Sequence, residues 1–484
     1  MIRPLETKKI KFSKLADAIG IEYFGTDFEV TGVAQNADEV RSGDIFLAIA
    51  GEKHHGAEFA ALAAQKGAVA VITDAKGSEL SKNLPTVVVG DPRKLVGELA
   101  AAFYDQPMKK MFTVGITGTN GKTTITTLLH QIWQTAGWSS GLIGTINTLI
   151  DSEVLPSRHT TPEAADLQAI MATMSERHIR SVAMEVSSHA LELNRIIGCH
   201  FNIAGFTNLT QDHLDFHENM ENYFNAKAKL FQYGLSEQAV INIDNDAGTK
   251  LAKLIKIPVT TVSRMATSAD WHYESIDQDQ VKIRGAGGIL IEGRTSLIGA
   301  FNLDNLLMAV AIAYMSGIDP IEISTNLSKY RGAPGRFEKV EVGQKFTAFV
   351  DYAHTPDAVN RVLAEARKLT NGSVIAVLGC GGDRDRSKRP LMGDALVAGS
   401  DIAIFTSDNP RSEDPIEILK QMSGEHKGEV VVDRKMAIER AVALAKQGDV
   451  VAVLGKGHET GQEIQGKNFP FDDAVILANA IAGN

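Results

Sequence analysis

The sequence predicts an α/β protein of three unequal domains. Two observations carry this prediction: short apolar runs alternate with helical patterns, and the chain is 484 residues long. Such alternation is typical of parallel sheets covered by helices. Chains beyond about 250 to 300 residues usually divide into domains, because a single hydrophobic core stops growing at that size. We expect the domains at residues 1–108, 109–332 and 333–484.

The composition narrows the class of protein. The chain has 44% hydrophobic and 22% charged residues, as globular proteins do. Its net charge of -10 argues against a nucleic-acid partner or a membrane surface. The two cysteines, Cys199 and Cys380, are too few for a disulfide framework and fit a reducing compartment. No stretch reaches the roughly 18 apolar residues of a membrane span, so we expect a cytoplasmic protein without one.

The apolar runs place the expected elements. Between residues 28 and 89, runs such as GDIFLAIAG and GAVAVIT alternate with the helical stretch AEFAALAAQKG, which predicts a small α/β domain. The run MFTVGIT at 111–117 enters a Gly-rich turn and then a helix over 122–135. Further apolar runs at 181–186, 203–206 and 240–243 predict a parallel sheet around this first strand.

The same alternation restarts after YRGAPGR, residues 330–336. Four apolar runs separated by helical patterns predict a doubly wound third domain: TAFVDYAH, SVIAVLGC, DIAIFTSD and VVAVLGKG.

The turn after residue 117 has the features of a phosphate-binding loop. It lies between a strand and a helix and consists of Gly118, Thr119, Asn120, Gly121, Lys122, Thr123 and Thr124. Glycines let backbone N–H groups converge on phosphate oxygens, Lys122 can reach the outer phosphates, and Thr123 can bind Mg²⁺. The strict spacing would place glycine at position 116, where this chain has Ile116. The alternative is a Gly-rich turn with an exposed lysine.

The motif TGTNGKTT after an apolar strand resembles the ATP loop of the Mur ligases and of their relative folylpolyglutamate synthase. The resemblance extends from about Asp44 to Glu459. It implies a small α/β uridine-binding domain, a central P-loop parallel-sheet ATPase domain and a C-terminal Rossmann-like domain. It also implies that ATP activates a carboxylate as an acyl phosphate, which an amine then converts to an amide.

A metal centre is expected at the end of the run SVAMEVSSH. Glu185 lies there at the carboxyl edge of a predicted strand, where open α/β sheets bind ligands. The segment TNLTQDHLDFH adds further possible ligands, namely Asp212, His213, Asp215 and His217. The resemblance selects Glu185 and His213, together with Thr123, as Mg²⁺ ligands. From the residue alone, His213 is equally a structural histidine.

The segment YFNAKAKLF places Lys227 and Lys229 on a predicted helix. On composition alone such a pair belongs to a solvated helix face. Lys227 matches the lysine that Mur ligases carbamylate, so the resemblance implies a carbamate on Lys227 that orients Mg²⁺.

The resemblance also assigns substrate contacts. His159, Thr160, Thr161, Ser187 and Arg195 match contacts to UDP-N-acetylmuramoyl-L-alanyl-D-glutamate, and arginine suits an anionic peptide. The alternative for the first three is a loop punctuated by proline. In the first domain, Gln35, Asn36, Ala37 and Asp38 replace the family's aspartate, serine, arginine run, so the uridine contacts stay unassigned.

More ATP contacts are implied near the start of the third domain. Asn302 and Asn305 in GAFNLDN match ATP-site residues, although the simplest interpretation is a helix cap. Arg336 and Asp351 match residues that meet ATP from the third domain, so ATP is expected in an interdomain cleft whose closure excludes water.

The added amino acid is indicated by DNPR, residues 408–411. Asp408, Asn409, Pro410 and Arg411 could form a plain turn at a strand end. The motif resembles that of diaminopimelate-adding Mur ligases, where the planar arginine fork binds the second carboxylate that L-lysine lacks. The matching residues Arg384, Gly455 and Glu459 complete the implied site for meso-diaminopimelate.

Two alternatives remain open. The chain could be the L-lysine-adding ligase of the same family, or an ATP-binding scaffold without turnover. Folylpolyglutamate synthase is more distant, because it does not combine DNPR with GKGHE. We expect a monomer.

Overall fold

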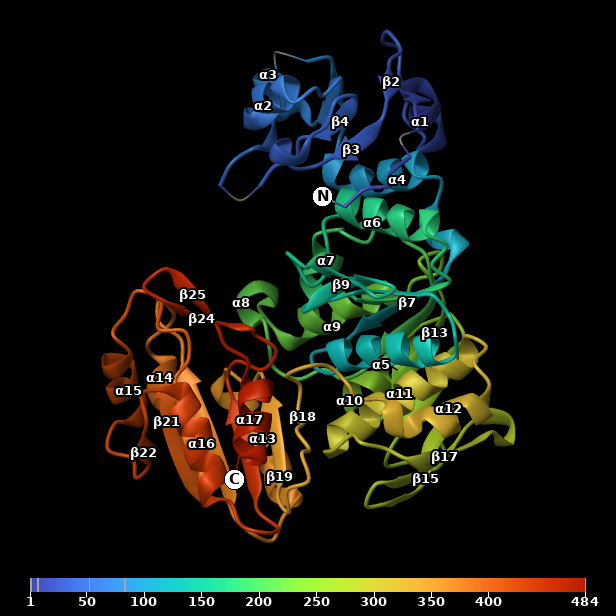
Figure 1. Ribbon diagram of the computed structural model, residues 1–484. Coiled ribbons are helices and arrows are strands. Elements are labelled where there is room, and N and C mark those ends of the chain that lie inside the picture. Colours follow the sequence, from blue (N-terminus) through green and yellow to red (C-terminus); the bar gives the residue numbers. More distant parts are fainter. Residues whose placement is uncertain (1, 7, 52, 82–83, 484) are drawn as a thin grey trace. The chain divides into compact units, whose positions relative to one another are not determined.

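The computed structural model describes residues 2–6, 8–51, 53–81 and 84–483 (Figure 1). The chain divides into two compact units. The first comprises residues 1–276, 282–292 and 305–326, and the second comprises 277–281, 293–304 and 327–484. The domain boundaries expected near residues 108 and 332 stay predictions.

The N-terminal part of the first unit is a small α/β domain, as predicted. Its parallel sheet has the order β3-β4-β5-β6. The elements are β1 (Ile10–Lys11), α1 (Phe12–Ala18), β2 (Glu29–Val30), β3 (Gly32–Ala34), β4 (Asp44–Leu47), α2 (Ala60–Gln65), β5 (Ala70–Thr73), α3 (Ala75–Leu80), β6 (Thr86–Val88) and α4 (Pro92–Phe103).

This small domain packs against the central sheet's helix α6 (Ala164–Glu176). Ala164 and Ala165 belong to the same hydrophobic cluster as Val96 and Leu99 of α4. Helix α4 also lies close to a second segment of the chain, because a Cβ added at Gly97 would lie 1.9 Å from the backbone oxygen of Ile197. A glycine is therefore required in the middle of α4, despite its low helix propensity.

The central sheet has eleven strands in the order β10-β9-β8-β11-β7-β12-β13-β14-β15-β16-β17. They are β7 (Phe112–Thr117), β8 (Ser140–Ile143), β9 (Asn147–Ile150), β10 (Glu153–Pro156), β11 (Ser181–Glu185), β12 (Phe201–Phe206), β13 (Ser236–Asn242), β14 (Val259–Ser263), β15 (Trp271–Asp277), β16 (Gln280–Arg284) and β17 (Leu290–Arg294).

The predicted parallel arrangement is confirmed from β8 to β15. The sheet is not parallel throughout, because β9 pairs antiparallel with both β8 and β10. The reason is local: a two-residue turn at 151–152, with Asp151 at φ 56°, joins β9 to β10 and is too short for a parallel crossover.

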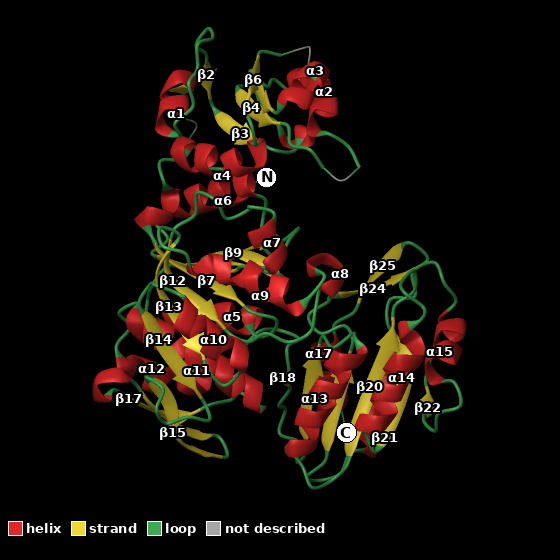
Figure 2. Ribbon diagram, turned by 180° about the vertical axis from the view of Figure 1, so that it is seen from behind, coloured by secondary structure: helices red, strands yellow, loops and turns green. Residues whose placement is uncertain are grey.

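Helices accompany this sheet in chain order (Figure 2). They are α5 (Lys122–Thr135), α6, α7 (Ser188–Glu192), α8 (Leu214–His217), α9 (Met220–Ala228), α10 (Asp246–Leu254), α11 (Ala300–Met315) and α12 (Pro320–Asn326). The predicted helix over 122–135 is confirmed at both ends.

The second unit holds a six-stranded sheet of order β18-β19-β23-β20-β21-β22. Its elements are β18 (Glu338–Lys339), β19 (Thr347–Asp351), α13 (Pro356–Lys368), β20 (Val374–Cys380), α14 (Lys388–Gly399), β21 (Ile402–Ser407), α15 (Pro415–Ser423), β22 (Glu429–Val430), α16 (Arg434–Leu444), β23 (Val450–Leu454), β24 (Gly461–Ile464), β25 (Lys467–Pro470) and α17 (Asp473–Ala482).

All four apolar runs predicted for this region are strands, and each pairs parallel with its neighbour. Alternate residues of β20 enter different cores: Val374 and Leu378 pack with α13 and α14, whereas Ile375 and Val377 pack with α16 and α17. Helices therefore cover both faces of the sheet, and the doubly wound prediction is confirmed.

Among the described residues, none of the helices combines the length and the apolar character needed to cross a membrane.

The helix α5 carries a buried histidine that should make the stability of the first unit depend on pH. His130 is 5% exposed, its Nδ1 lies 2.7 Å from Ser140 Oγ, and burial lowers its pKa to about 4. The unfolded chain binds this proton from about pH 6.5 downward, so stability falls as the pH drops from 6.5 towards 4. We expect a loss of about 2 to 3 kcal/mol from this residue.

The test is the pH dependence of thermal unfolding in His130→Gln, which should be flatter between pH 6.5 and 4 than in the unsubstituted protein. His54→Gln, at a histidine whose side chain is 68% exposed, is the matched control and should leave the pH profile unchanged. Equal profiles for the unsubstituted protein and His130→Gln would contradict the prediction.

Candidate functional site

The phosphate-binding loop follows β7 and opens α5. Gly118 has φ 148° and Gly121 has φ 90°, a region that favours glycine. A Cβ at Gly118 would lie 1.8 Å from Thr207 Oγ1, and one at Gly121 would lie 2.4 Å from Asn305 Oδ1. Both glycines are therefore required by conformation and by space.

The structure explains why this chain has isoleucine at position 116, where the strict phosphate-loop spacing has glycine. Ile116 is a fully buried residue of β7, in register with Glu185 of β11 and Gly205 of β12. The loop therefore begins at Gly118, after the strand has ended.

The lysine of the loop is held against its own backbone. Lys122 is half-buried, and its Nζ donates to the carbonyl oxygens of Gly118 and Thr119, both at 2.9 Å. Thr119 is itself fixed, because its N–H donates to the Asn208 carbonyl at 2.9 Å. The loop is thus an ordered structure with its cation at the helix N-terminus, where anions bind.

Glu185 is a completely buried carboxylate beside this loop. Its Oε2 accepts hydrogen bonds from the hydroxyls of Thr123 and Thr145, each at 3.0 Å, and its Oε1 accepts from the Thr145 N–H at 2.8 Å. Thr123 and Glu185, both predicted as metal ligands, therefore lie together. Hard oxygen donors of this kind suit Mg²⁺.

His213 lies just before α8 in the αL conformation, with 47% of its side chain exposed and its ring centre 6.2 Å from that of Tyr223. Its Nε2 lies 3.6 Å from Asp212 Oδ2, and its ring is 4.8 Å from that of His189. Across the described residues, no group of three or more His, Cys, Asp or Glu side chains could hold a metal. Of the neighbouring residues, His217 is buried and bonded to Ser188, while Asp215 is exposed.

Lys227 of α9 is 1% exposed, so the alternative of a solvated helix face is wrong for this residue. Its Nζ donates to the Gly118 carbonyl at 2.8 Å, the same oxygen that Lys122 contacts. Burial, reinforced by the charge of Lys122, lowers the pKa of Lys227 well below its ordinary value. Lys229 behaves as a surface residue: its side chain is 41% exposed and pairs with Glu192.

The predicted peptide contacts partly gather near Glu185. The Thr161 hydroxyl is buried and donates to the Glu185 carbonyl at 2.9 Å. The same hydroxyl accepts a hydrogen bond from the Ser187 N–H at 3.1 Å. The Thr160 hydroxyl lies 3.0 Å from that of Thr145. Arg195 pairs with Glu163 at 2.7 Å and donates to the Thr161 carbonyl, whereas its buried Nε has no hydrogen-bond partner among the described residues. His159 is exposed.

The interpretation of Asn302 and Asn305 as helix caps is wrong, because α11 begins at Ala300 and both lie inside it. Both side chains are buried. Asn305 lies against Gly121 of the phosphate loop. Asn302 donates to the Ile298 carbonyl, and its Oδ1 is buried without a partner.

Arg336 and Asp351 lie together in the second unit. Asp351 ends β19 and accepts hydrogen bonds from the N–H groups of Phe337 and Ala353, both at 2.7 Å. Burial raises its pKa, against the opposing charge of Arg336. The guanidinium of Arg336 lies over the Tyr352 ring, 4.7 Å from its centre, and its buried Nε has no partner.

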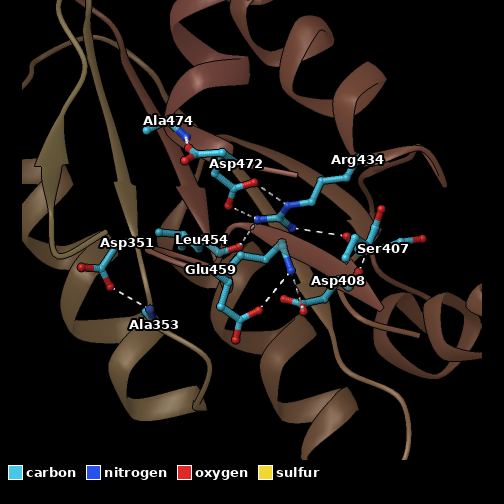
Figure 3. Close-up of polar contacts among 12 residues, drawn as sticks. Asp351, Ala353, Ser407, Asp408, Arg434, Leu454, Glu459, Asp472 and Ala474 are labelled. Carbon is cyan, nitrogen blue, oxygen red and sulfur yellow. Dashed lines mark hydrogen bonds and ion pairs between the residues drawn. The ribbon is translucent and has the colours of Figure 1, made fainter. Parts of the chain in front are cut away.

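The DNPR and GKGHE segments meet at the carboxyl ends of β21 and β23 (Figure 3). Asp408 and Asn409 are buried, and Asn409 Nδ2 donates to Glu459 Oε2 at 2.8 Å. A Cβ at Gly455 would lie 2.8 Å from Asp408 Oδ2. The segment is therefore more than a surface turn, because its side chains form part of a buried polar network.

Arg411 follows this network and is tied to the hairpin of β24 and β25. It has φ 50°, its Nε lies 3.2 Å from Glu463 Oε2, and its side chain also donates to the Gly382 carbonyl. Backbone bonds link Arg411 to Glu463 and Gln465. Arg384, from the neighbouring loop, is exposed.

Three charged residues of this network were not predicted from the sequence: Lys456, Arg434 and Asp473. All three are fully buried. Arg434 donates twice to Asp473, at 2.8 and 2.6 Å. It also donates to the Leu454 carbonyl (Figure 3). The signal available for Lys456 was its position between the two glycines of GKGHE.

The loop in the first domain where uridine contacts stayed unassigned has structural roles. Gln35 Oε1 accepts from the Ala165 N–H at 2.9 Å, and Asn36 caps the turn that contains Asp38.

The chain is similar to known proteins along most of its length. Three family models match: Mur ligase family, catalytic domain at residues 29–104; Mur ligase middle domain at 116–313; and Mur ligase, glutamate ligase domain at 335–457. A UDP-N-acetylmuramoyl-L-alanyl-D-glutamate–2,6-diaminopimelate ligase of Streptomyces coelicolor is 45% identical, over 99% of this chain and 98% of that protein. The chain belongs to the Mur ligase family.

Other relatives agree. The protein of the same name from Bacillus velezensis is 40% identical over 98% of this Mur ligase chain and 99% of its own length. A solved structure of a UDP-N-acetylmuramoyl-L-alanyl-D-glutamate–2,6-diaminopimelate ligase has 32% identity, a TM-score of 0.74 and 99% coverage of both chains. The family and the three-domain α/β fold predicted from the sequence are confirmed.

The geometry of the phosphate loop makes a direct prediction for Gly121→Ala. A residue other than glycine is strained at φ 90°, and its Cβ would collide with Asn305. We expect binding of a fluorescent ATP analogue to weaken by about tenfold or more. Gly90→Ala is the control, since a Cβ there meets nothing within 4 Å. Unchanged affinity in a folded Gly121→Ala protein would show that the loop does not bind the nucleotide.

Proposed function

We propose that this Mur ligase adds meso-diaminopimelate to UDP-N-acetylmuramoyl-L-alanyl-D-glutamate, with ATP and Mg²⁺, in peptidoglycan precursor synthesis. The observation that carries the proposal is the buried constellation around DNPR and GKGHE, in a chain 45% identical to a relative named for this reaction. Separate groups of residues are proposed to bind ATP, the nucleotide peptide and diaminopimelate.

The phosphate loop provides for ATP. Lys122 and the N–H groups at the start of α5 neutralise the phosphates, and Asn305 supports Gly121. Thr123 and Glu185 offer the oxygen ligands that Mg²⁺ prefers, with His213 as a further proposed ligand. The metal supplies charge neutralisation during transfer of the γ-phosphoryl group. In the second unit, Arg336, Asp351 and Asn302 are the remaining proposed ATP residues.

Lys227 is proposed to carry a carbamate. Only a neutral amine attacks carbon dioxide, and burial beside Lys122 favours the neutral form of Lys227. The nitrogen lone pair bonds to the carbon, a proton leaves, and the product is an anion. The carbamate would place a negative charge beside Lys122, in the loop where the amino groups of Lys122 and Lys227 both donate to the Gly118 carbonyl.

The peptide substrate is assigned to the residues around Glu185. Thr160, Thr161 and Ser187 offer hydroxyls, His159 is exposed, and Arg195 has a spare buried Nε. In the proposed reaction the γ-carboxylate of the D-glutamyl residue attacks the γ-phosphorus of ATP, and ADP leaves. The resulting acyl phosphate is then attacked by the amine of diaminopimelate, and phosphate leaves.

The acceptor is assigned to the second unit. Arg411 and Arg384 suit the carboxylates of diaminopimelate, and Glu459 and Asp408 suit an ammonium group. Asn409, Pro410 and Gly455 shape the surrounding backbone. L-Lysine has no second carboxylate for Arg411. A monomeric state and a cytoplasmic location stay predictions.

The direct test measures phosphate release from ATP with UDP-N-acetylmuramoyl-L-alanyl-D-glutamate and either meso-diaminopimelate or L-lysine. We expect release with diaminopimelate and little with lysine. Release with lysine alone would keep the ligase and refute the acceptor assignment. Binding of ATP without release, whichever acceptor is present, would indicate a scaffold without turnover.

Arg411→Ala should act on the acceptor alone. Loss of a charge-assisted bond of about 1.5 to 3 kcal/mol predicts a KM for diaminopimelate about 10- to 100-fold higher. The KM for ATP should not change, because Arg411 is held by Glu463 and Gly382 and is not one of the residues proposed to bind ATP. Arg440→Ala, which removes a surface ion pair with Glu429, is the control. An unchanged KM for diaminopimelate would remove Arg411 from the site.

Lys227→Ala should lower kcat by about 100-fold, the scale of losing one preorganised charge at a phosphoryl-transfer site. Lys229→Ala, on the same helical segment but at the surface, should keep normal activity. The carbamate itself is tested by depleting carbon dioxide. The unsubstituted enzyme should lose activity and regain it with bicarbonate, whereas Lys227→Ala should not respond. Full activity without carbon dioxide would refute the carbamate.

A further inference from the structure

The second unit contains a buried lysine to which the proposed reaction gives no task. Lys456 follows β23, is 0% exposed, and lies between the two segments that form the proposed acceptor site. Its Nζ lies 3.0 Å from Asn409 Oδ1 and 3.1 Å from Glu459 Oε2. Asp408 Oδ1 is more distant, at 4.0 Å. A buried lysine is rare and needs compensation, which these three groups provide.

The contacts of Lys456 determine how Asn409 is oriented. Asn409 Oδ1 accepts from Lys456 Nζ and from the Glu463 N–H at 2.9 Å, so its amide nitrogen must face the other way. That nitrogen donates to Glu459 Oε2 at 2.8 Å. Because an ammonium group can only donate, the orientation follows from Lys456 and does not rest on a choice between equivalent atoms.

The same contacts fix one oxygen of Glu459 and leave the other for a ligand. Oε2 accepts from both Lys456 and Asn409. Among the residues that the structure describes, Oε1 has no protein donor, and the side chain is 34% exposed. Glu459 is therefore held by one oxygen while its second oxygen can reach a cationic group.

We infer that Lys456 is a positioning residue of the acceptor site, which sets the orientation of Glu459 and Asn409 for the amino acid that is added. This inference rests on the proposed function and extends it. Lys456 does not touch the substrate in this assignment. It acts through Glu459 and Asn409, and its effect should appear in acceptor binding alone.

The surrounding charges support this role. Asp408, Glu459 and Asp473 face two cations, Lys456 and Arg434, so the ionised network has one surplus negative charge. A surplus of that sign suits an ammonium group. Burial alone would raise the pKa of Glu459, but the charge of Lys456 and the bonds from Asn409 and Lys456 outweigh it, and the pKa is lowered.

The test compares steady-state kinetics of the full-length enzyme with Lys456→Met, which keeps the length of the side chain and removes its charge. We expect the KM for diaminopimelate to rise about tenfold or more, while the KM for ATP and for the nucleotide peptide stay within about twofold. Lys435→Met, at an exposed lysine of the same unit, is the matched control and should change none of these values.

A pH profile separates positioning from general damage. The groups that face Glu459 are Lys456, His458, Asp408, Arg434 and Tyr352. Without Lys456, Glu459 should take up its proton at higher pH, so the acid limb of 1/KM for diaminopimelate should move upward. In a Glu459→Gln background, Lys456→Met should raise the KM for diaminopimelate less than it does alone, since part of its effect passes through that carboxylate.

The outcomes are distinct. If the KM for diaminopimelate is unchanged, or if all three KM values rise together, the inference is wrong. Lys456→Gln, which can still donate to Asn409 but carries no charge, replaces the methionine variant if that one unfolds. Unfolding of both would mark Lys456 as purely structural and overturn the inference. Failure of the proposed function would be seen separately, as absence of diaminopimelate-dependent phosphate release in the unsubstituted enzyme.

Discussion

The carboxyl edge of parallel strands is the constraint on which both sites depend. In the first unit β7 and β11 end side by side, which puts the phosphate loop next to Glu185. In the second unit β21 and β23 end near each other, which brings DNPR to GKGHE. Here β20 lies between the two strands and runs parallel to both. Side chains separated by about 50 positions or more in the chain meet because these strands run in the same direction and end at the same edge of the sheet.

Burial at these edges changes the chemistry of ordinary side chains. Glu185 is fully buried, and its carboxylate accepts hydrogen bonds from threonine hydroxyls and a backbone N–H. These bonds hold its two oxygens in fixed positions. Lys227 is buried beside the charge of Lys122, and both effects lower its pKa and favour the neutral amine. Lys456 is compensated by acceptors and keeps its partners in place. Desolvation is thus the common basis of the roles proposed for these residues: Mg²⁺ ligand for Glu185, nucleophile towards carbon dioxide for Lys227, and positioning cation for Lys456.

Much of this could be predicted from sequence, and the failures have physical causes. Apolar runs identified β7, β11, β12 and β13 of the central sheet and β19, β20, β21 and β23 of the second sheet, and α5 was predicted at both ends because a Gly-rich loop fixes its start. The hairpin of β9 and β10 was missed, since its turn contains neither proline nor glycine. Lys456 and Arg434 were missed because a charged residue is normally exposed, and only tertiary structure shows that Asn409, Glu459 and Asp473 compensate them. The sequence does not show to within one turn where a helix begins, so it could not decide whether Asn302 and Asn305 cap α11 or lie inside it.

The hairpin of β24 and β25 limits how acceptor preference can be transferred between proteins. Its backbone donates to the Asn409 side chain and pairs with Arg411, and Glu463 holds the guanidinium of Arg411. The four residues DNPR are therefore only part of a unit that includes a segment about 50 positions later in the chain. Grafting the motif alone into a relative with a different hairpin would supply the arginine without the Glu463 side chain and the hairpin backbone that orient it. A transplant of the proposed specificity therefore has to carry both segments.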